Sequence, residues 1–276
     1  MKTIITHANC SDGFTAAWAA YVPGDDVIYA SYGDPVPDGL EDKAVVILDF
    51  SYPRETLEAL HAKCSSLLVL DHHKTAQADL AGLPYCQFDM ARSGAKMAWD
   101  HFRTGPSVLV DYVQDRDLWR HALPYTREIN ACLRWTDRSF ERWDELHHLL
   151  LMKDGVAGLA RAGHLTLDLI RRITEESAKH PGVVTLPDGK RIAVINRGLL
   201  FASELGSYLV KRYDVDAAAI WNQGPDGTYF FSLRSDGKLD CSGLAKAFGG
   251  GGHAGAAGFR IGYFPWSGVQ PLEDAL

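Results

Sequence analysis

The chain has 276 residues, and its 35 acidic against 28 basic side chains give a formal net charge of -7. Hydrophobic residues make up 46% and charged residues 23% of the chain, as in ordinary soluble globular proteins. This balance excludes intrinsic disorder, a collagen-like repeat and a protein that coats long nucleic acid through bulk positive charge. It does not exclude a small nucleotide substrate, because a local metal site can attract phosphate to an acidic protein.

Cysteine usage and the distribution of apolar residues indicate a soluble, cytoplasmic protein. The five cysteines are scattered and form no CxxC pair, which favours free thiols over a disulfide framework or a zinc site. The N-terminal MKTIITHANCSDG has no signal-peptide core. No apolar run approaches the ~20 residues needed to span a bilayer, so we expect no membrane partner.

The first 120 residues alternate short apolar runs with segments of helical spacing. Strands are expected at residues 3–6, 44–48 and 67–70, and helices at 13–21, 53–64, 93–102 and 107–119. Strands that are apolar throughout and separated by helices predict a parallel sheet covered on both faces. The fold class is therefore α/β.

The rest of the chain predicts two further parts. A mostly helical stretch follows, and the turn signals HPG at 180–182 and PDG at 187–189 mark its end. Strands are expected after it at 191–195, 217–221 and 229–234, with helices at 202–213 and 242–248. We therefore expect a catalytic domain at 1–136, a helical connector at 137–188 and a smaller mixed α/β domain at 189–276.

Acidic and histidine side chains gather where the expected strands of the first domain end. They are His7 and Asp12 after the first strand, Asp49 after AVVIL, the run Asp71, His72 and His73 after LLVL, and Asp115 with Asp117 in DYVQDRDLW. Taken alone, each aspartate is a common turn former or helix cap. Together they predict one shared site at the edge of an open α/β sheet, suited to Mn²⁺, Mg²⁺ or a related divalent ion.

The glycine-rich string GGGGHAGAAGF at 249–259 is the most specific single signal in the second half. Consecutive glycines let backbone N–H groups approach an anion closely, and His253 adds a side-chain donor. Small residues continue through AGAAG to Phe259, which predicts tight packing rather than a flexible linker. Upstream, Arg234 and Ser235 end an expected strand, where a guanidinium can hold a phosphate through two hydrogen bonds.

DGFTAAWAA, AVVILDF, LLVLDHH and GGGGHAGAAGF, in this order, resemble the DHH phosphoesterase superfamily with its DHH-associated C-terminal domain. The resemblance spans nearly the whole chain, and the helical middle contributes least. The superfamily includes RecJ-type exonucleases, oligoribonucleases, cyclic-dinucleotide phosphodiesterases and exopolyphosphatases. The resemblance implies an active site in the cleft between the two domains.

The resemblance also implies roles for individual residues. The implied metal ligands are His7, Asp12, Asp49, His72 and Asp115; the implied catalytic residues are His72, His73 and Asp71; the implied substrate-binding residues are Arg234, Ser235, Gly250, Gly251, Gly252 and His253. Asp115 is preferred to Asp117 because an aromatic residue, Trp119, follows it by four places. Asp117 is then expected either to orient one of the ligands or to be an ordinary residue of the helix, although a ligand role for it stays open.

The first motif departs from the commonest family pattern. Cys10 stands where an aspartate is usual, and His7 lies one residue closer to it than in most members. Cys10 is either a thiolate ligand or a small packing residue. The sequence thus leaves open whether one or two ions bind.

These features predict an Mn²⁺-dependent phosphoesterase that hydrolyses phosphodiester or phosphomonoester bonds through a metal-activated water. The expected substrates are short oligonucleotides, nucleotides or polyphosphate, and not long duplex nucleic acid. An exopolyphosphatase is one alternative, and a catalytically silent nucleotide-binding regulatory module is another. The exact substrate, the cleavage polarity and homo-oligomerisation stay open.

Overall fold

The computed structural model describes residues 1–272, which divide into two compact units. The first unit is Met1–Thr166 and the second begins at Leu167, so the division falls within one long helix, α8 (Gly155–Ser177). The expected boundaries at 136 and 188 differ from this division. Part of the expected connector packs into the first unit, where Trp143, Leu146 and Leu150 are buried in the core.

A five-stranded parallel sheet forms the centre of the first unit, as the sequence predicts. Its strands are β1 (Lys2–His7), β2 (Asp26–Ala30), β3 (Ala44–Leu48), β4 (Ser66–Asp71) and β5 (Cys86–Phe88). Their order is β2-β1-β3-β4-β5, and every pair is parallel. The edge strands β2 and β5 are not among the expected strands, although β2 contains the apolar run VIYA; β5 is only three residues long.

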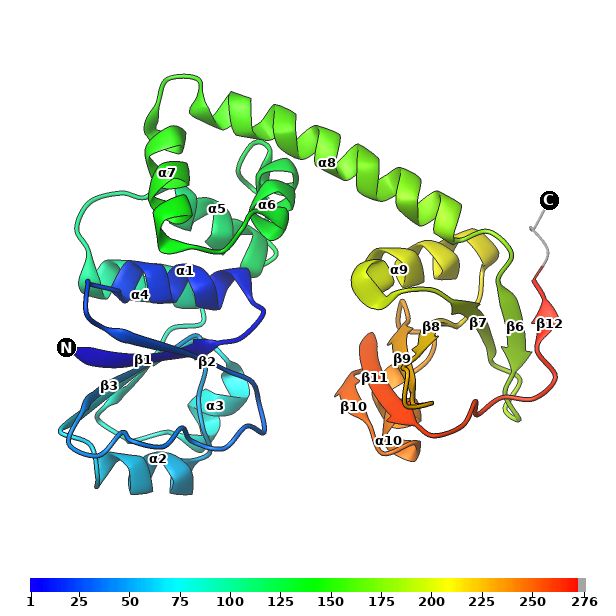
Figure 1. Ribbon diagram of the computed structural model, residues 1–276, viewed down its shortest axis with the longest axis horizontal. Helices are drawn as coiled ribbons and strands as arrows, with labels where there is room; N and C mark the ends of the chain where they lie inside the picture. The colour runs from blue at the N-terminus through cyan, green and yellow to red at the C-terminus, as the bar shows by residue number, and fades with distance from the viewer. Residues whose placement is uncertain (273–276) are drawn as a thin grey trace. The chain divides into compact units, whose positions relative to one another are not determined.

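Helices cover both faces of this sheet (Figure 1). On one face lie α1 (Ser11–Ala20), α4 (Gly94–Phe102), α5 (Val108–Asp117), α6 (Thr126–Trp135) and α7 (Phe140–Leu151); on the other lie α2 (Arg54–His61) and α3 (Lys74–Asp79). Adjacent strand residues point to opposite faces, so Ile4 and Ile5 belong to two separate core clusters. The two-sided burial explains why β3 and β4 carry the continuous apolar runs AVVIL and LLVL.

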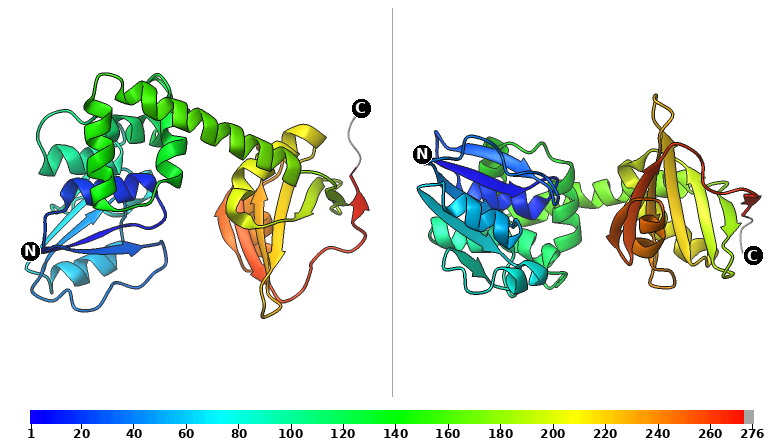
Figure 2. Two further views of the ribbon diagram at one scale, coloured as in Figure 1. Left: turned by 45° about the horizontal axis from the view of Figure 1, so that its top comes forward. Right: turned by 90° about the horizontal axis from the view of Figure 1, so that it is seen from below.

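The second unit contains a seven-stranded mixed sheet. Its strands are β6 (Gly182–Thr185), β7 (Arg191–Asn196), β8 (Ala217–Gln223), β9 (Tyr229–Arg234), β10 (Gly251–His253), β11 (Ala256–Ile261) and β12 (Gln270–Pro271). Their order is β10-β11-β9-β8-β7-β6-β12. Among the described strands of this second sheet, only β7 and β8 pair in parallel. The helix α9 (Ala202–Tyr213) and the helix α10 (Cys241–Ala247) contribute to different core clusters, one on each face of the sheet (Figure 2).

The glycine-rich segment folds as a hairpin rather than as a loop. Gly251 pairs with Gly258 and His253 with Ala256 in the antiparallel ladder of β10 and β11. A Cβ atom on Gly250 would lie 2.2 Å from the carbonyl oxygen of Gly258, so this position has no room for a side chain. The tight packing expected from the small residues is present. No helix within residues 1–272 is both long enough and apolar enough to cross a membrane.

Candidate metal centre

The carboxyl ends of β1, β3 and β4 place His7, Asp49 and Asp71 at one edge of the first sheet. Asp49 follows the last residue of β3 and has a φ of 54°, in the left-handed region that residues other than glycine rarely adopt. Such backbone strain persists where surrounding structure holds it, and it is concentrated at functional sites. The end of β3 is therefore shaped to orient the Asp49 carboxylate rather than to make a relaxed turn.

The ring of His72 lies among three carboxylates. Its Nε2 atom is 3.1 Å from Asp49 Oδ1, 3.5 Å from Asp117 Oδ2 and 3.8 Å from Asp12 Oδ2. Asp12 comes from the first turn of α1, and Asp117 is the last residue of α5. Four separate segments of the chain thus bring an imidazole and three acids together.

Two oxygens of this cluster are buried without a hydrogen-bond partner among the described residues: Oδ2 of Asp12 and Oδ2 of Asp49. Burial, reinforced by the charge of Asp49, raises the pKa of Asp12 well above its usual value. Burial and the charge of Asp117 likewise raise the pKa of Asp49 to about 7. Burial and the neighbouring carboxylates therefore outweigh the favourable contributions of His72 to Asp12 and of His73 to Asp49.

Asp115, one of the five expected ligands, lies elsewhere. Its carboxylate accepts hydrogen bonds from the Ala122 amide at 3.0 Å, the Leu123 amide at 3.1 Å and the hydroxyl of Thr126. Burial alone raises the pKa of Asp115, but these hydrogen bonds outweigh it and leave the pKa lowered. The structure therefore brings Asp117, and not Asp115, to His72. The two positions carry the same residue type two places apart, so the sequence could not distinguish them.

Asp71 holds the other histidine of the triplet. Its Oδ1 atom lies 2.7 Å from Nδ1 of His73, and its Oδ2 atom accepts a hydrogen bond of 2.6 Å from Ser51. The same Oδ1 also accepts the backbone amide of His72 at 2.7 Å. The hydrogen bond with Asp71 raises the pKa of His73 to about 9, despite partial burial. His73 therefore carries a positive charge at neutral pH beside the acidic cluster.

His7 and Cys10 form a second group with Asp49. One ligand atom of each of the three lies within 4.8 Å of the others. Burial lowers the pKa of His7, and burial together with the charges of Asp49 and Asp12 raises the pKa of Cys10. The thiol of Cys10 is thus protonated in this setting, although it faces two residues with ligand atoms.

Two glycines allow the helices to approach the sheet edge. A Cβ atom on Gly94, at the start of α4, would lie 2.4 Å from Cβ of Asp49. A Cβ atom on Gly13 in α1 would lie 2.5 Å from the carbonyl oxygen of His7. The close approach of α4 also lets the Ala95 amide donate to Asp12 Oδ1 at 3.1 Å. Gly94 and Ser51 had no role among the sequence-based predictions, although a Ser-Gly pair at a helix start is a readable signal for Gly94.

The residues present fit a divalent cation. Carboxylate oxygens combined with imidazole nitrogen are the ligands that Mn²⁺ and related ions prefer. The buried oxygens of Asp12 and Asp49 that accept no hydrogen bond among the described residues belong to carboxylates that lie against the same histidine ring. A cation bound there would stabilise charges that burial otherwise penalises.

A cavity of about 220 Å³ adjoins the cluster and includes Asp12 and Asp117 in its lining. Basic and amide side chains also line it, among them Arg116, Arg134 and Asn130. The guanidinium of Arg116 stacks over the Trp119 ring, 4.6 Å from its centroid. The cavity therefore combines acidic groups that suit a metal with cationic groups that suit a phosphate.

The expected substrate-binding residues of the second unit divide into two groups. The guanidinium of Arg234 donates to Ser203 Oγ at 2.7 Å, to Ser232 Oγ at 3.0 Å and to the Leu233 carbonyl, and burial lowers its pKa. The hydroxyl of Ser235 donates to the Asp216 carbonyl and accepts from two amides of the following turn. By contrast, Gly251, Gly252 and His253 are exposed on β10.

Comparison with known proteins agrees with this architecture. Residues 202–271 match the DHHA1 domain family. The uncharacterized protein R106 of Acanthamoeba polyphaga mimivirus is 25% identical over an alignment of 288 residues including gaps; the alignment covers 95% of this chain and 68% of that protein.

Two solved structures share the fold. A DHH domain, described as coming from a member of a family of ribosomal proteins, has a TM-score of 0.54 at 14% identity, covering 98% of this chain and 83% of that one. A pGpG-specific phosphodiesterase from Vibrio cholerae has a TM-score of 0.50 at 15% identity, covering 95% and 93%.

These comparisons define the chain as an α/β protein with the fold of a solved DHH-domain structure. The chain has the fold of the DHH superfamily and carries a DHHA1 domain in its second unit, which confirms the resemblance seen in the sequence.

Proposed function

We propose that this protein is a divalent-metal-dependent phosphoesterase that acts on short oligonucleotides or small nucleotides. One observation carries the proposal: a histidine surrounded by three buried or half-buried carboxylates, two of which have a buried oxygen without a hydrogen bond among the described residues. Phosphoester hydrolysis needs a nucleophilic water and a means of balancing phosphoryl charge. The name of the Vibrio cholerae phosphodiesterase, whose fold is similar, agrees with this reaction class.

Asp12, Asp49, His72 and Asp117 are the proposed ligands, with His7 beside Asp49 as a donor for a second ion. Cys10 would join that second group only by releasing its proton to solvent as the ion binds. When bound, a divalent ion such as Mn²⁺ lowers the pKa of a water and balances charge on the phosphoryl oxygens. Asp117 replaces Asp115 in this set because only Asp117 has a carboxylate oxygen near His72 Nε2.

His73 is the proposed cationic group of the reaction. Asp71 fixes its Nδ1 atom and keeps the ring protonated, so Nε2 can donate to a phosphoryl oxygen or give a proton to the leaving oxygen. Ser51 in turn fixes Asp71. This Ser51–Asp71–His73 chain orients the donor without requiring any movement during the reaction.

Substrate binding in the second unit is proposed for Arg234, His253 and the glycine strand Gly250–Gly252. The exposed position of β10 and its close packing on β11 support this, because backbone groups there can approach an anion without interference from side chains. Arg234 would exchange part of its hydrogen bonding with Ser203 for a phosphate oxygen.

The test is a hydrolysis panel with Mn²⁺, Mg²⁺ and EDTA, run on short RNA, cyclic dinucleotides, nucleotide monophosphate esters and polyphosphate. We expect release of 5′-mononucleotides or phosphate from the small nucleotide substrates, and its loss in His72→Ala and Asp49→Ala. A matched control is His148→Ala, on the exposed surface of α7.

The outcomes of the panel separate the candidate functions. Phosphate release from polyphosphate alone would assign an exopolyphosphatase. Nucleotide binding without turnover under every metal would assign a silent binding module. Equal turnover by wild type and both cluster variants would place the active centre elsewhere.

A further inference from the structure

A cavity of about 570 Å³ lies on the α2 side of the first sheet, beside the proposed metal centre. Three aromatic side chains line it: Tyr32, Phe50 and Tyr52. We call it the aromatic cavity. Its volume lies within the range of about 300–1,000 Å³ that is typical of small-molecule sites.

The aromatic cavity is joined to the proposed catalytic residues by direct contacts. The Tyr32 ring centroid lies 5.4 Å from that of His7 and 5.9 Å from that of His73, both nearly edge-on. Ser51, which also lines the cavity, donates to Asp71, the partner of His73. A group seated in this cavity would therefore be next to a phosphate held at His73.

One buried group in the cavity wall is unpaired. Tyr52 is only 4% exposed, and its hydroxyl has no hydrogen-bond partner among the described residues. A buried hydroxyl without a partner loses roughly 1–3 kcal/mol relative to one that is satisfied, and a hydrogen bond to a bound ligand would recover that loss. Ser51, Thr56 and Thr75 place further hydroxyl groups in the same lining.

The charge of the lining excludes phosphate as its occupant. Asp34 and Asp79 line the aromatic cavity, and no lysine or arginine does so within the described residues. An acidic, aromatic, hydroxyl-rich wall suits a flat neutral ring with hydrogen-bond donors at its edge. A nucleobase has that chemistry, whereas a polyphosphate chain does not.

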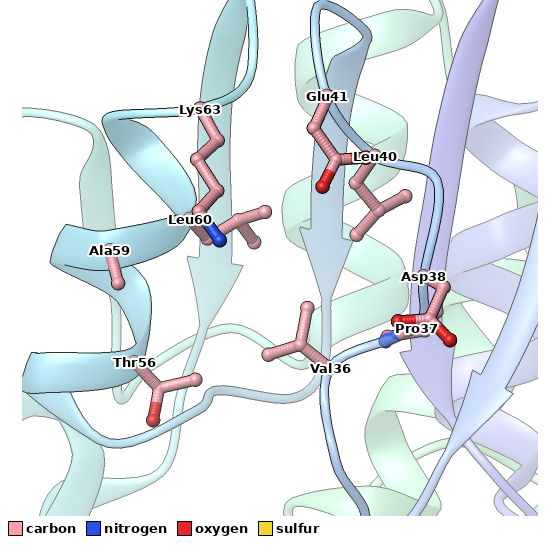
Figure 3. Close-up of a pocket in the computed structure, with 9 residues that line it drawn as sticks. All are labelled: Val36, Pro37, Asp38, Leu40, Glu41, Thr56, Ala59, Leu60 and Lys63. Atoms are coloured by element: carbon pink, nitrogen blue, oxygen red, sulfur yellow. The ribbon is translucent and has the colours of Figure 1, made fainter.

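An adjoining cavity shows that the aromatic groups are concentrated near His73. Val36 and Thr56 line both spaces, and Figure 3 shows them facing each other across the end of the second cavity. This second cavity is lined further along by Leu40, Leu60 and Lys63 and contains no aromatic side chain among the described residues. The end that can stack a ring is thus the end nearest the proposed catalytic histidine.

We propose that the aromatic cavity is a nucleobase subsite, in which the base stacks on Tyr32 and its edge hydrogen-bonds to the Tyr52 hydroxyl. This inference rests on the proposed phosphoesterase function and names the part of the substrate that the first unit recognises. It makes Tyr32 and Tyr52 specificity-determining residues. It favours nucleotide esters over polyphosphate.

The first experiment measures binding without chemistry. Adenosine and ribose, which carry no phosphate, are titrated calorimetrically into the full-length protein in EDTA. We expect adenosine to bind at least about fivefold more tightly than ribose, the lower end of what stacking one base contributes. Tyr32→Ala and Tyr52→Phe should each remove most of that preference.

Tyr85→Phe is the matched control, because the Tyr85 hydroxyl is also buried and unpaired but the ring stacks on His61, outside the aromatic cavity. It should bind adenosine as wild type does. Thermal melts of the variants establish that each is folded. Equal adenosine binding by wild type, Tyr32→Ala and Tyr52→Phe would overturn the proposal.

The second experiment measures KM and kcat for a dinucleotide and for its analogue with one base replaced by an abasic sugar. The two tyrosine variants should raise KM about fivefold for the intact dinucleotide, with kcat little changed and the abasic analogue unaffected. An equal loss on both substrates would contradict base recognition. Absence of any turnover together with tyrosine-dependent adenosine binding would reject the phosphoesterase function while supporting the subsite.

Discussion

The Nε2 atom of His72 lies 3.1 Å from Oδ1 of Asp49, and Asp49 reaches this position through a left-handed backbone conformation. His72 follows one strand of the parallel sheet and Asp49 follows its neighbour, so register alone brings them near each other. The strained φ then turns the carboxylate toward the ring. These two residues are the centre of the proposed metal site, and the predictions begin with the acids around them.

Exchanging Asp117 for asparagine should lower turnover, whereas exchanging Asp115 for asparagine should lower stability. Asp117→Asn removes a charge beside His72 and should lower metal-dependent turnover more than about 100-fold, because even partners outside a ligand set change activity by about 10–100-fold. Asp115→Asn disturbs three loop hydrogen bonds and should lower the free energy of unfolding by about 1–3 kcal/mol. Turnover with Mn²⁺ and urea unfolding measure the two effects. The reverse pattern would restore Asp115 as the ligand.

Asp49→Asn should stabilise the metal-free protein at pH 8. The pKa of Asp49 is raised from 3.8 to about 7 in the folded state. Its ionisation therefore destabilises the folded state progressively as the pH rises from about 4 to 7, and the full destabilisation is present above pH 7. Removing the charge should raise the free energy of unfolding by up to roughly 4 kcal/mol, since one pKa unit corresponds to about 1.4 kcal/mol.

The measurement is denaturant unfolding in EDTA at pH 5 and pH 8. The gain should be larger at pH 8, and Mn²⁺ should stabilise wild type but not the variant. A variant that is less stable than wild type at both pH values would contradict the burial argument.

His73 should remain protonated well above neutral pH in the chelated protein. Its pKa is about 9 because of the hydrogen bond with Asp71, so the pair stabilises the fold fully below pH 6.5 and loses this contribution as pH rises through about 9. Titration of the ring by NMR tests the value. In Asp71→Asn the pKa should fall toward 6.5, and a wild-type ring that already titrates near 6.5 would disprove the pairing.

Gly94→Ala should damage both the fold and the metal centre. The added Cβ would lie 2.4 Å from Cβ of Asp49, and overpacking of this kind lowers stability by about 1–3 kcal/mol. Metal affinity should fall with it, because the clash displaces Asp49. Gly158→Ala in α8 is the control: nothing lies within 4 Å of its Cβ, and it should be neutral or stabilising by up to about 1 kcal/mol. Calorimetric Mn²⁺ titration and thermal melts distinguish the two variants.

Much of the first unit was predictable from local sequence. The apolar runs before Asp49 and Asp71 indicated buried parallel strands, and the rule that parallel strands place functional groups at their carboxyl edge indicated that His72 and Asp49 would meet. The edge strand β5 was not predictable because it is only three residues long, whereas the apolar run VIYA of β2 was a local signal that the predictions did not use. The division within α8 was also not predictable, because helical periodicity does not say which core a helix packs against.

By itself, the sequence determined the α/β class, the glycine-rich DHHA1 segment and the acidic and histidine residues of the proposed metal centre. Part of the chain's acid surplus belongs to that centre. Only the tertiary structure decided between Asp115 and Asp117. Both lie on α5, but a two-residue step turns a side chain about the helix axis, and the partners come from distant segments: the 122–126 loop for Asp115 and the end of β4 for Asp117. The contact between Tyr32 and His73 is likewise visible only in the structure. It depends on packing between loops, which produces no periodic pattern in the sequence.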